Sequence, residues 1–491
     1  MYFNQYLYVL KLYLKILISF LSFAIFNFNL AQNLSLDFSD NIRVSSDYKP
    51  LVCFKNKNKY VLVQKKTKST DCDIKINLFD NQLNNSNQFD VLIHNHSFIS
   101  INQFFKKILL FTSENKDNKT TLYVHELDLD YGFTNTKELH SEFNINGYTT
   151  SYNIADTTFE QNFYVLAELP FRLKKNEDIK LLTFNNSLKL IAEVYNKLDL
   201  IFEANRDNKL LVSPTGQLVM VKTFWKKRNN FYLYQLGKNV INEVEIKLNN
   251  REIADIDFLF NAKNELVIAG FFSSQNRYNY EGYFIHKYDE DLKLVHKNQY
   301  FFNKNIVENF KSSSEIKENG FGLDKFRLTD FSIDQNTNYF LLAEHLSRKK
   351  IKGETRWISK GMLAIKFNKN GNYVWACPID LKQASSKVKF IGSFHLNSFK
   401  SPEYFYNDLS NLKIRKGIPP EYGTYNYCGT KRITFSSVGQ IIKNNLEINF
   451  PNNNSIKYSF YPKQLNLDKG GKSIFSFVDY MGNNMLIGVE K

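Results

Sequence analysis

The sequence predicts an all-β fold, a β-propeller of about seven four-stranded blades, with six or eight blades also compatible with the pattern. Short strand-like runs recur to the end of the chain, separated by turns rich in Asn, Asp and Lys. Aromatic residues, which favour strands, make up 15% of the chain, whereas Gly (20) and Pro (9) are few. A unit of four strands repeats about every 50 residues, and the period grows to roughly 75 residues where the loops are longer. Such a period is typical of propeller blades.

Each repeated unit has the same order of elements. One unit reads "IADIDFLFNAKNELVIAGFFSSQ" and then "GYFIHKYDEDLKLVHKNQYF", and the next reads "LTDFSIDQNTNYFLLAEHLS" and then "GMLAIKFNKNGNYVWACPI". A first strand and a polar turn lead into a nearly continuous apolar strand, and after a variable loop two strands close around a second polar turn. Gly282 is expected to begin the third strand of its unit. The continuous apolar strand predicts burial on both faces between neighbouring blades.

The end of the chain, from about residue 387 to 491, contains two more partial units. The last strand is expected to complete the first blade, which would join the two ends of the ring and leave only short, protected edges. Residues 32–491 are therefore predicted to be a single propeller domain. One segment, "KNIVENFKSSSEIKEN" at 304–319, is the exception for which a short helix is expected.

Residues 1–31 read as a signal peptide. Lys11 and Lys15 precede the apolar run 16–26, and Ala31 is the expected cleavage position. The alternative is an uncleaved anchor, but Lys15 interrupts the ~20 apolar residues that a spanning helix needs. We expect an exported protein of the periplasm, the outer membrane surface or the extracellular space, with no membrane span after cleavage.

Four cysteines, Cys53, Cys72, Cys377 and Cys428, are an even number in a chain that is expected to be exported, and disulfides are therefore permitted. Local pairing, Cys53 with Cys72 and Cys377 with Cys428, would close the shortest loops. The alternative is buried free thiols. No C-x-x-C occurs, so the sequence indicates no redox or zinc motif.

The charge distribution and the short motifs of the sequence indicate no particular chemical activity. The net charge is +15, but the lysines are scattered, which indicates a solvated basic surface, and no nucleic-acid partner is expected. Phosphate loops, nucleophile elbows and H-E-x-x-H motifs are missing. His94 and His96 alternate on one strand but lack a third ligand. We therefore predict no catalytic residue, metal or cofactor.

One group of polar residues is predicted to bind a ligand. Asp330 opens a unit, Glu344 and His345 end its inner apolar strand, and Asn407 and Asp408 end a strand of a later unit. Strand ends at one face of a propeller line its central pocket. The alternative is that these residues cap loops and form hydrogen bonds between blades, as most buried polar groups do.

The stretch 253–491 resembles a group of uncharacterised exported bacterial proteins with a β-propeller-like fold. The resemblance rests on "IADIDFLFNAKNELVIAGFFS", on the second unit quoted above, and on "YFYNDLSN" and "RITFSSVGQIIKN". It covers about half of the chain. It implies the fold and export, and it implies no activity and no residue roles.

Two classes of function are compatible with these observations. The first is a monomeric, non-enzymatic binding or scaffold protein of the bacterial cell envelope, with an envelope protein or a glycan as its partner. The second is a propeller-type glycoside hydrolase or lyase that acts on a polysaccharide, with paired carboxylates supplied by different blades.

Overall fold

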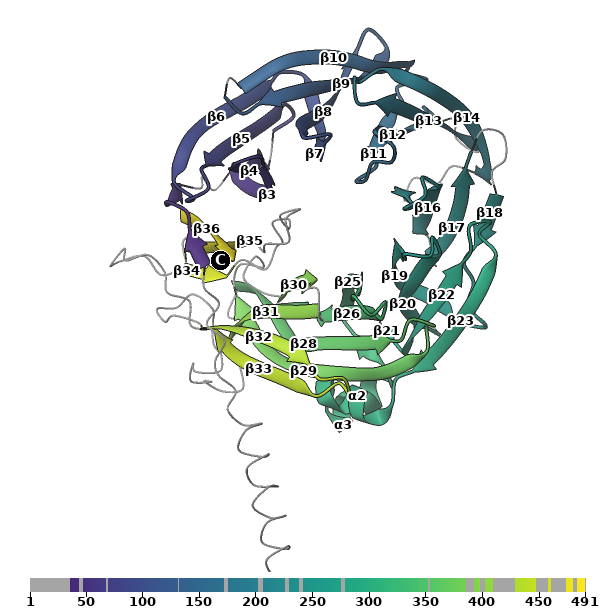
Figure 1. The fold of residues 1–491 in the computed structure, drawn as a ribbon. Helices are drawn as coiled ribbons and strands as arrows, with labels where there is room; N and C mark the ends of the chain where they lie inside the picture. The colour runs from purple at the N-terminus through teal and green to yellow at the C-terminus, as the bar shows by residue number, and fades with distance from the viewer. Residues whose placement is uncertain are drawn as a thin grey trace, which may run out of the picture.

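The structure is a computed structural model, and Figure 1 shows its strands arranged as a ring of blades. The predicted signal peptide, residues 1–31, lies outside the residues that the structure describes. These residues are 36–43, 47–67, 69–130, 132–171, 175–201, 206–225, 229–237, 242–274, 279–351, 354–385, 393–397, 402–408, 429–446, 458–460, 474–479 and 484–490.

The first four blades each take four consecutive strands, and each blade begins with its innermost strand. Blade 1 consists of β3 (Tyr48–Asn56), β4 (Lys59–Lys66), β5 (Cys72–Phe79) and β6 (Asn85–Ile93). Blade 2 consists of β7 (His96–Phe104), β8 (Lys107–Lys116), β9 (Lys119–Asp128) and β10 (Gly132–Phe143). Blade 3 consists of β11 (Ser151–Ile154), β12 (Asn162–Glu168), β13 (Asn176–Asn185) and β14 (Leu190–Ile201). Blade 4 consists of β15 (Arg206–Val212), β16 (Leu218–Trp225), β17 (Asn229–Leu236) and β18 (Asn242–Glu245).

Three further blades follow the same order. Blade 5 consists of β19 (Glu252–Phe260), β20 (Leu266–Ser273), β22 (Gly282–Tyr288) and β23 (Leu294–Phe301). Blade 6 consists of β25 (Phe326–Ile333), β26 (Tyr339–His345), β28 (Glu354–Phe367) and β29 (Tyr373–Ser385). Blade 7 consists of β30 (Ser393–Asn397), β31 (Pro402–Asp408), β32 (Gly429–Phe435) and β33 (Ile441–Leu446). As predicted, Gly282 begins the third strand of its unit.

The eighth blade joins the two ends of the described chain. It consists of β34 (Tyr458–Phe460), β35 (Ile474–Asp479) and β36 (Asn484–Glu490), with β1 (Leu36–Phe38) as its outer strand, and β2 (Ile42–Arg43) also pairs with β36. Leu36 lies opposite Glu490 in the antiparallel register. The two ends meet as predicted. The expectation that the last strand completes the first blade was wrong, because the N-terminal strand β1 completes the last blade. Blade 1 already has four strands of its own, so the open position is at blade 8, which brings the number of blades to eight.

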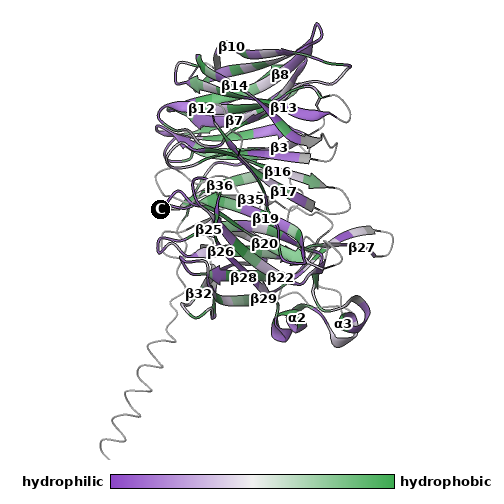
Figure 2. Ribbon diagram, turned by 90° about the vertical axis from the view of Figure 1, so that its right-hand side faces the viewer, coloured by the Kyte–Doolittle hydropathy of each residue, from purple (hydrophilic) through white to green (hydrophobic). Residues whose placement is uncertain are grey.

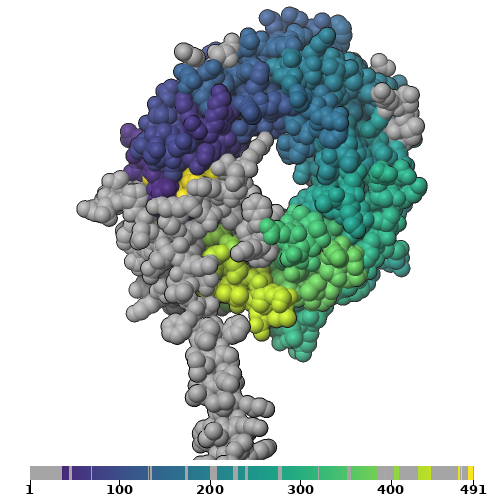
Figure 3. Space-filling model, viewed as in Figure 1, coloured from purple at the N-terminus to yellow at the C-terminus, as the bar shows by residue number. Residues whose placement is uncertain are grey.

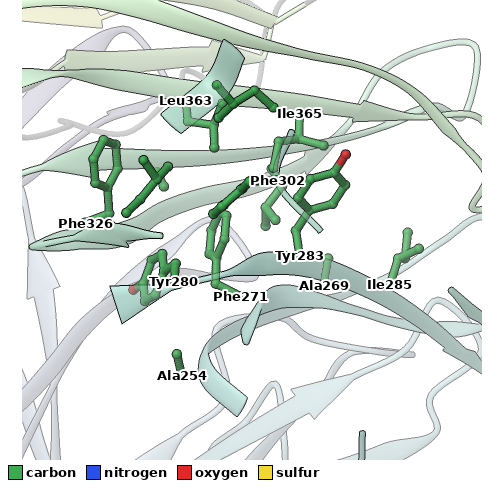
Figure 4. Packing of buried hydrophobic residues seen from close by; sticks show 14 of the residues in the cluster. Ala254, Ala269, Phe271, Tyr280, Tyr283, Ile285, Phe302, Phe326, Leu363 and Ile365 are labelled. Atoms are coloured by element: carbon green, nitrogen blue, oxygen red, sulfur yellow. The ribbon is translucent and has the colours of Figure 1, made fainter. Parts of the chain in front are cut away.

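The core of the molecule lies between neighbouring blades. Every residue of β20 and β26 is buried, whereas the outer strand β23 has no buried residue, which confirms the predicted burial of the second strand. Figure 4 shows part of the cluster between blades 5 and 6, where the rings of Phe271 and Tyr280 stack at a centroid distance of 4.7 Å. Because the core is divided among these interfaces, the ring can stay open at its centre, and Figure 3 shows that opening.

The antiparallel strands give the ring two different faces. Turns between the first and second and between the third and fourth strands of a blade lie on one side, here called the turn face. The remaining connections lie on the opposite side, the connection face. The larger elaborations belong to the connection face at blades 5 and 6: α2 (Lys304–Phe310), α3 (Ser313–Asn319), the small sheet of β21 (Asn279–Tyr280) with β24 (Leu323–Asp324), and β27 (Ser347–Ile351).

The helical segment expected at 304–319 is confirmed as two short helices. Lys311 and Ser312 separate them, and Ser312 forms a capping box with Glu315 at the start of α3. Among the described residues, no helix has the length and apolarity needed to cross a membrane.

Candidate functional site

Glu344, one of the predicted ligand-binding residues, joins blade 6 to blade 7. Its carboxylate is 4% exposed and accepts the backbone N–H of Ser393 at 2.7 Å and also the hydroxyl of Ser393. Burial raises the pKa of Glu344, although the bonds from Ser393 and the charge of Arg327 act in the opposite direction. Ser393 belongs to the innermost strand of blade 7, so these bonds cross the interface between the two blades.

His345 belongs to a different interface. Its Nδ1 accepts the backbone N–H of Lys360 at 3.1 Å, and its ring lies edge-on to Phe326 at a centroid distance of 5.6 Å. Burial lowers the pKa of His345 to about 4, so the ring is neutral at pH 7. Glu344 and His345 are neighbours in a strand and face opposite sides of the sheet. The structure therefore does not bring them into one pocket.

The remaining predicted residues lie near the boundary between blades 6 and 7. Asp330 is half-buried on β25 and pairs with Leu342, which places it on the same face of blade 6 as Glu344. Asn407 is fully buried on β31, and its backbone carbonyl accepts a hydrogen bond from Gln383 Nε2 at 3.1 Å. The side chain of Asp408 lies outside the described residues. The described contacts of this group include hydrogen bonds between blades, which is the alternative that the sequence left open. A ligand-binding role for the group stays a prediction.

Carboxylates that the sequence interpretation missed gather on the innermost strands. Asp255 Oδ2 on β19 accepts the N–H of Leu328 at 3.0 Å and the hydroxyl of Tyr280 at 3.1 Å, which ties blade 5 to blade 6. Burial raises the pKa of Asp257, and the negative charge of Asp330 on the next blade adds to that rise. Asp257 and Asp330 thus come from neighbouring blades, and the charge of Asp330 acts on Asp257. The two aspartates that interrupt the apolar run "IADIDF" could have indicated these carboxylates from the sequence alone.

One cluster has the composition of a metal site. Ligand atoms of His140, Glu142 and Glu193 lie within 4.8 Å of one another. However, the ammonium of Lys180 already contacts Glu142 and lies 2.8 Å from Glu193 Oε1. His140 Nε2 is 3.1 Å from Glu142 Oε1, and burial lowers the pKa of His140. Lys180 supplies the positive charge that a cation would bring, so the cluster is an ion-pair network between blades 2 and 3.

His94 and His96 have separate partners. His94 Nδ1 lies 3.2 Å from Asp71 Oδ2, whereas His96 Nδ1 lies 2.8 Å from Thr112 Oγ1. From Thr112 a chain of short contacts continues through His125 to Thr136, and it crosses all four strands of blade 2. The two histidines therefore do not share a ligand position.

The structure does not pair Cys53 with Cys72, and it agrees with the alternative of buried free thiols. Both residues are buried free thiols, and they belong to two different core clusters on opposite faces of blade 1. Strand β4 also separates their strands in the sheet. Cys377 is a half-buried free thiol, and its proposed partner Cys428 lies outside the described residues.

A cleft on the turn face lies between blades 1 and 2. Its volume is about 340 Å³, near the lower end of the range that is typical of small-ligand sites. We call it the blade 1–2 cleft, and it is lined by the β3–β4 turn, the β7–β8 turn and the end of β9 with its following turn, namely Asn56, Lys57, Asn58, Lys59, Lys106, Lys107, Ile108, Glu126, Leu127, Asp128, Leu129 and Asp130.

The hairpin turns place four lysines around this cleft. Phe105 and Lys106 both have positive φ, the backbone that type I′ hairpin turns require, and Lys57 has a φ of 53°. Asn56 Nδ2 donates to the carbonyl of Lys106 at 3.2 Å and so joins the two blades across the cleft. The cleft is therefore built from positions that the repeat makes equivalent in neighbouring blades.

The charges of the cleft are only partly paired. Lys59 Nζ lies 2.5 Å from Asp130 Oδ1, and Lys107 Nζ lies 2.9 Å from Glu126 Oε1. Lys57 and Lys106 are exposed, and within the described part of the chain neither ammonium has an ion-pair or hydrogen-bond partner. The lining thus has four lysines and three carboxylates, the third being Asp128, and keeps a net positive charge. The two lysines without an ion pair suit an anionic ligand, and the amide groups and Asp128 suit hydroxyl groups on it.

Comparison with known proteins found distant matches among solved structures. The sequence matches no known protein-family model, and it matches no curated protein. Among solved structures, a prolyl endopeptidase has a TM-score of 0.41 at 9% identity, over 91% of this chain and 54% of that one. The β-propeller domain of the Trilobed protease from Pyrococcus furiosus has a TM-score of 0.33 at 9% identity, over 70% of this chain and 93% of that one.

A third solved structure, the polysaccharide lyase Uly1, has a TM-score of 0.37 at 7% identity, over 90% of this chain and 89% of that one. The chain spans about half the length of the prolyl endopeptidase. At these identities and TM-scores the matches assign no activity to this chain.

Proposed function

We propose that this chain is an exported, non-enzymatic binding protein of the bacterial envelope, and that the blade 1–2 cleft holds its ligand. One observation carries the proposal: Lys57 and Lys106 bring two ammonium groups without an ion pair to a cleft whose other two lysines, Lys59 and Lys107, are paired with carboxylates. The signal-peptide pattern at residues 1–31 supports the exported location.

The chemistry of the lining favours an acidic saccharide. Lys57 and Lys106 provide donors for a carboxylate or sulfate group, and a hydrogen bond that involves an ionised group is about twice as strong as a neutral one. Asn58, Asp128 and Asp130 provide acceptors for sugar hydroxyls. A neutral sugar would use only the second set of groups, so we expect it to bind more weakly.

Calorimetric titration of the full chain with an oligouronate and with a neutral oligosaccharide of equal length tests this proposal. The double variant Lys57→Ala/Lys106→Ala should lose affinity for the oligouronate by about 10-fold or more for each lysine. Lys263→Ala/Lys297→Ala removes the same charge from exposed positions on blade 5 and serves as the matched control. Equal affinity for both saccharides, or unchanged affinity of the cleft variant, would refute the proposal.

A propeller-type glycoside hydrolase or lyase is the second candidate. The observation that favours it is the pair Asp257 and Asp330 on neighbouring innermost strands, where the negative charge of Asp330 adds to the rise in the pKa of Asp257. Glycosidases use two carboxyl groups that flank the scissile bond. Turnover of an acidic polysaccharide that is abolished by Asp257→Asn and by Asp330→Asn would establish this function in place of the first.

A further inference from the structure

The long connection of blade 6 concentrates positive charge. Residues 347–360, "SRKKIKGETRWISK", contain six basic residues and one acidic residue, so this stretch has a net charge of +5 out of the +15 of the whole chain. Its described residues form a hairpin in which β27 pairs with the first part of β28. We call it the basic hairpin, and the basic residues of its described strands are Arg348, Lys349, Lys350, Arg356 and Lys360.

The strand register distributes these residues over both sides of the hairpin. Arg348 pairs with Trp357, and Lys349 pairs with Arg356. Cross-strand partners share one face and successive residues alternate, so each face carries basic side chains. The guanidinium of Arg348 lies over the ring of Trp357, 5.8 Å from its centroid. Arg348, Lys349 and Lys350 are exposed.

The base of the basic hairpin is held against the helical insertion. Lys360 Nζ lies 2.8 Å from Glu315 Oε1 and donates to the carbonyl of Phe310 at 3.3 Å. Figure 2 shows β27, α2 and α3 on the same side of the ring. Phe321, in the segment that follows α3, is a large apolar side chain with 45% of its surface exposed. A fixed basic hairpin and an exposed phenyl ring thus belong to one face.

We propose that the basic hairpin and Phe321 dock this protein on a membrane surface that carries anionic phosphate headgroups. Clustered Lys and Arg are attracted to such surfaces, and an exposed apolar side chain such as that of Phe321 can insert at the boundary between headgroups and acyl chains. The surface lies on the connection face, whereas the blade 1–2 cleft opens on the turn face. Docking would therefore leave the cleft accessible to a ligand, and this proposal does not depend on the ligand assigned to that cleft.

Vesicle flotation tests the proposal with the full chain. We expect binding to vesicles of phosphatidylcholine mixed with phosphatidylglycerol, and little binding to vesicles of phosphatidylcholine alone, which reports any contribution of residues 1–31. Arg348→Ser/Lys349→Ser/Lys350→Ser should weaken partitioning to the anionic vesicles about fivefold per charge, or roughly 100-fold in all. Phe321→Ser should weaken it further.

The matched control is Lys116→Ser/Lys263→Ser/Lys297→Ser, which removes three exposed charges from other blades and should change partitioning much less. Loss of binding at raised salt gives a second test that needs no variant. Equal partitioning to both kinds of vesicle, or equal losses in the two triple variants, would overturn the proposal. A third outcome would also overturn the proposal. In it, the triple variant at the basic hairpin loses affinity for immobilised polyuronate but keeps its affinity for anionic vesicles.

Discussion

The ammonium of Lys222 and a carboxylate oxygen of Glu177 form an ion pair that has no solvent exposure, between blades 4 and 3. Asn208 completes the group: its Oδ1 lies 3.2 Å from Lys222 Nζ, and its Nδ2 lies 3.3 Å from Glu177 Oε1. Two charges can be buried at this depth only because they neutralise each other and have further hydrogen-bond partners.

Lys222→Met should therefore destabilise the protein strongly. The substitution leaves the Glu177 carboxylate buried without its countercharge, and the expected loss in free energy of unfolding is about 3–5 kcal/mol. Chemical denaturation measures it. Lys293→Met is the control, because Lys293 and Asp291 form an exposed pair whose removal should leave stability nearly unchanged. A small effect of Lys222→Met would contradict the buried pair, and the double variant Lys222→Met/Glu177→Leu should recover much of the loss.

Gly270 of β20 should not tolerate a methyl group. A Cβ atom at this position would lie 2.1 Å from the carbonyl oxygen of Asp255 and 2.9 Å from the Cα of Ile256, both of them backbone atoms of the neighbouring strand. Gly270→Ala should lower the melting temperature clearly, because the two strands must separate to make room. Gly237→Ala is the matched control, since open space surrounds that position. Equal melting temperatures of the two variants would show that β19 and β20 do not pack this closely.

The buried histidines should make stability depend on pH. Burial lowers the pKa of His345 to about 4, and it also lowers the pKa values of His125 and His286 to about 4. The unfolded chain, with a histidine pKa near ~6.5, binds more protons than the folded chain between these values. Each of these histidines therefore costs stability as the pH falls from about 6.5 towards 4.

A comparison with His345→Gln isolates this effect from the carboxylates with raised pKa values, such as Glu344, which act in the opposite direction. The variant should be less stable at pH 7, and its deficit should shrink by up to about 3 kcal/mol at pH 4, because only the parent chain has to protonate His345. Denaturation at several pH values measures the deficit. A deficit that stays constant with pH would mean that His345 is not buried in its neutral form.

The cysteines of blade 1 should react slowly in the folded protein. Burial raises the pKa of Cys72 to about 11 and raises that of Cys53 further, so neither forms much of the reactive thiolate at pH 8. Alkylation followed by mass spectrometry should label both residues only after unfolding, without any reductant. A peptide in which Cys53 and Cys72 are linked would contradict the placement of these residues on opposite faces of the sheet.

The sequence allowed the repeated unit to be predicted, because its most informative strand is buried on both faces. "LVIAGFFS" and "YFLLAEH" are wholly buried strands, and their apolar runs are visible without any structure. The closing strand could not be identified in this way. β1 has three residues, and its assignment to the last blade depends on which sheet lacks an outer strand.

The candidate site was less accessible to sequence reasoning. Lys57 and Lys106 lie about one repeat apart, and their proximity appears only when equivalent turns of neighbouring blades are superimposed. The basic hairpin was missed for a related reason, because a search for uninterrupted basic runs does not detect charges that a hairpin folds together. Glu344 and His345 are adjacent in the sequence, but the alternation of a strand sends them to different interfaces.

Lysine footprinting tests the proposed binding site most directly. The full chain is acetylated with and without an oligouronate, and the modified lysines are quantified by mass spectrometry. The proposal predicts that the ligand protects Lys57 and Lys106 and leaves Lys263 and Lys349 unchanged. Protection elsewhere with Lys57 and Lys106 still reactive, or no protection under conditions in which the ligand is bound, would contradict the assignment of the blade 1–2 cleft.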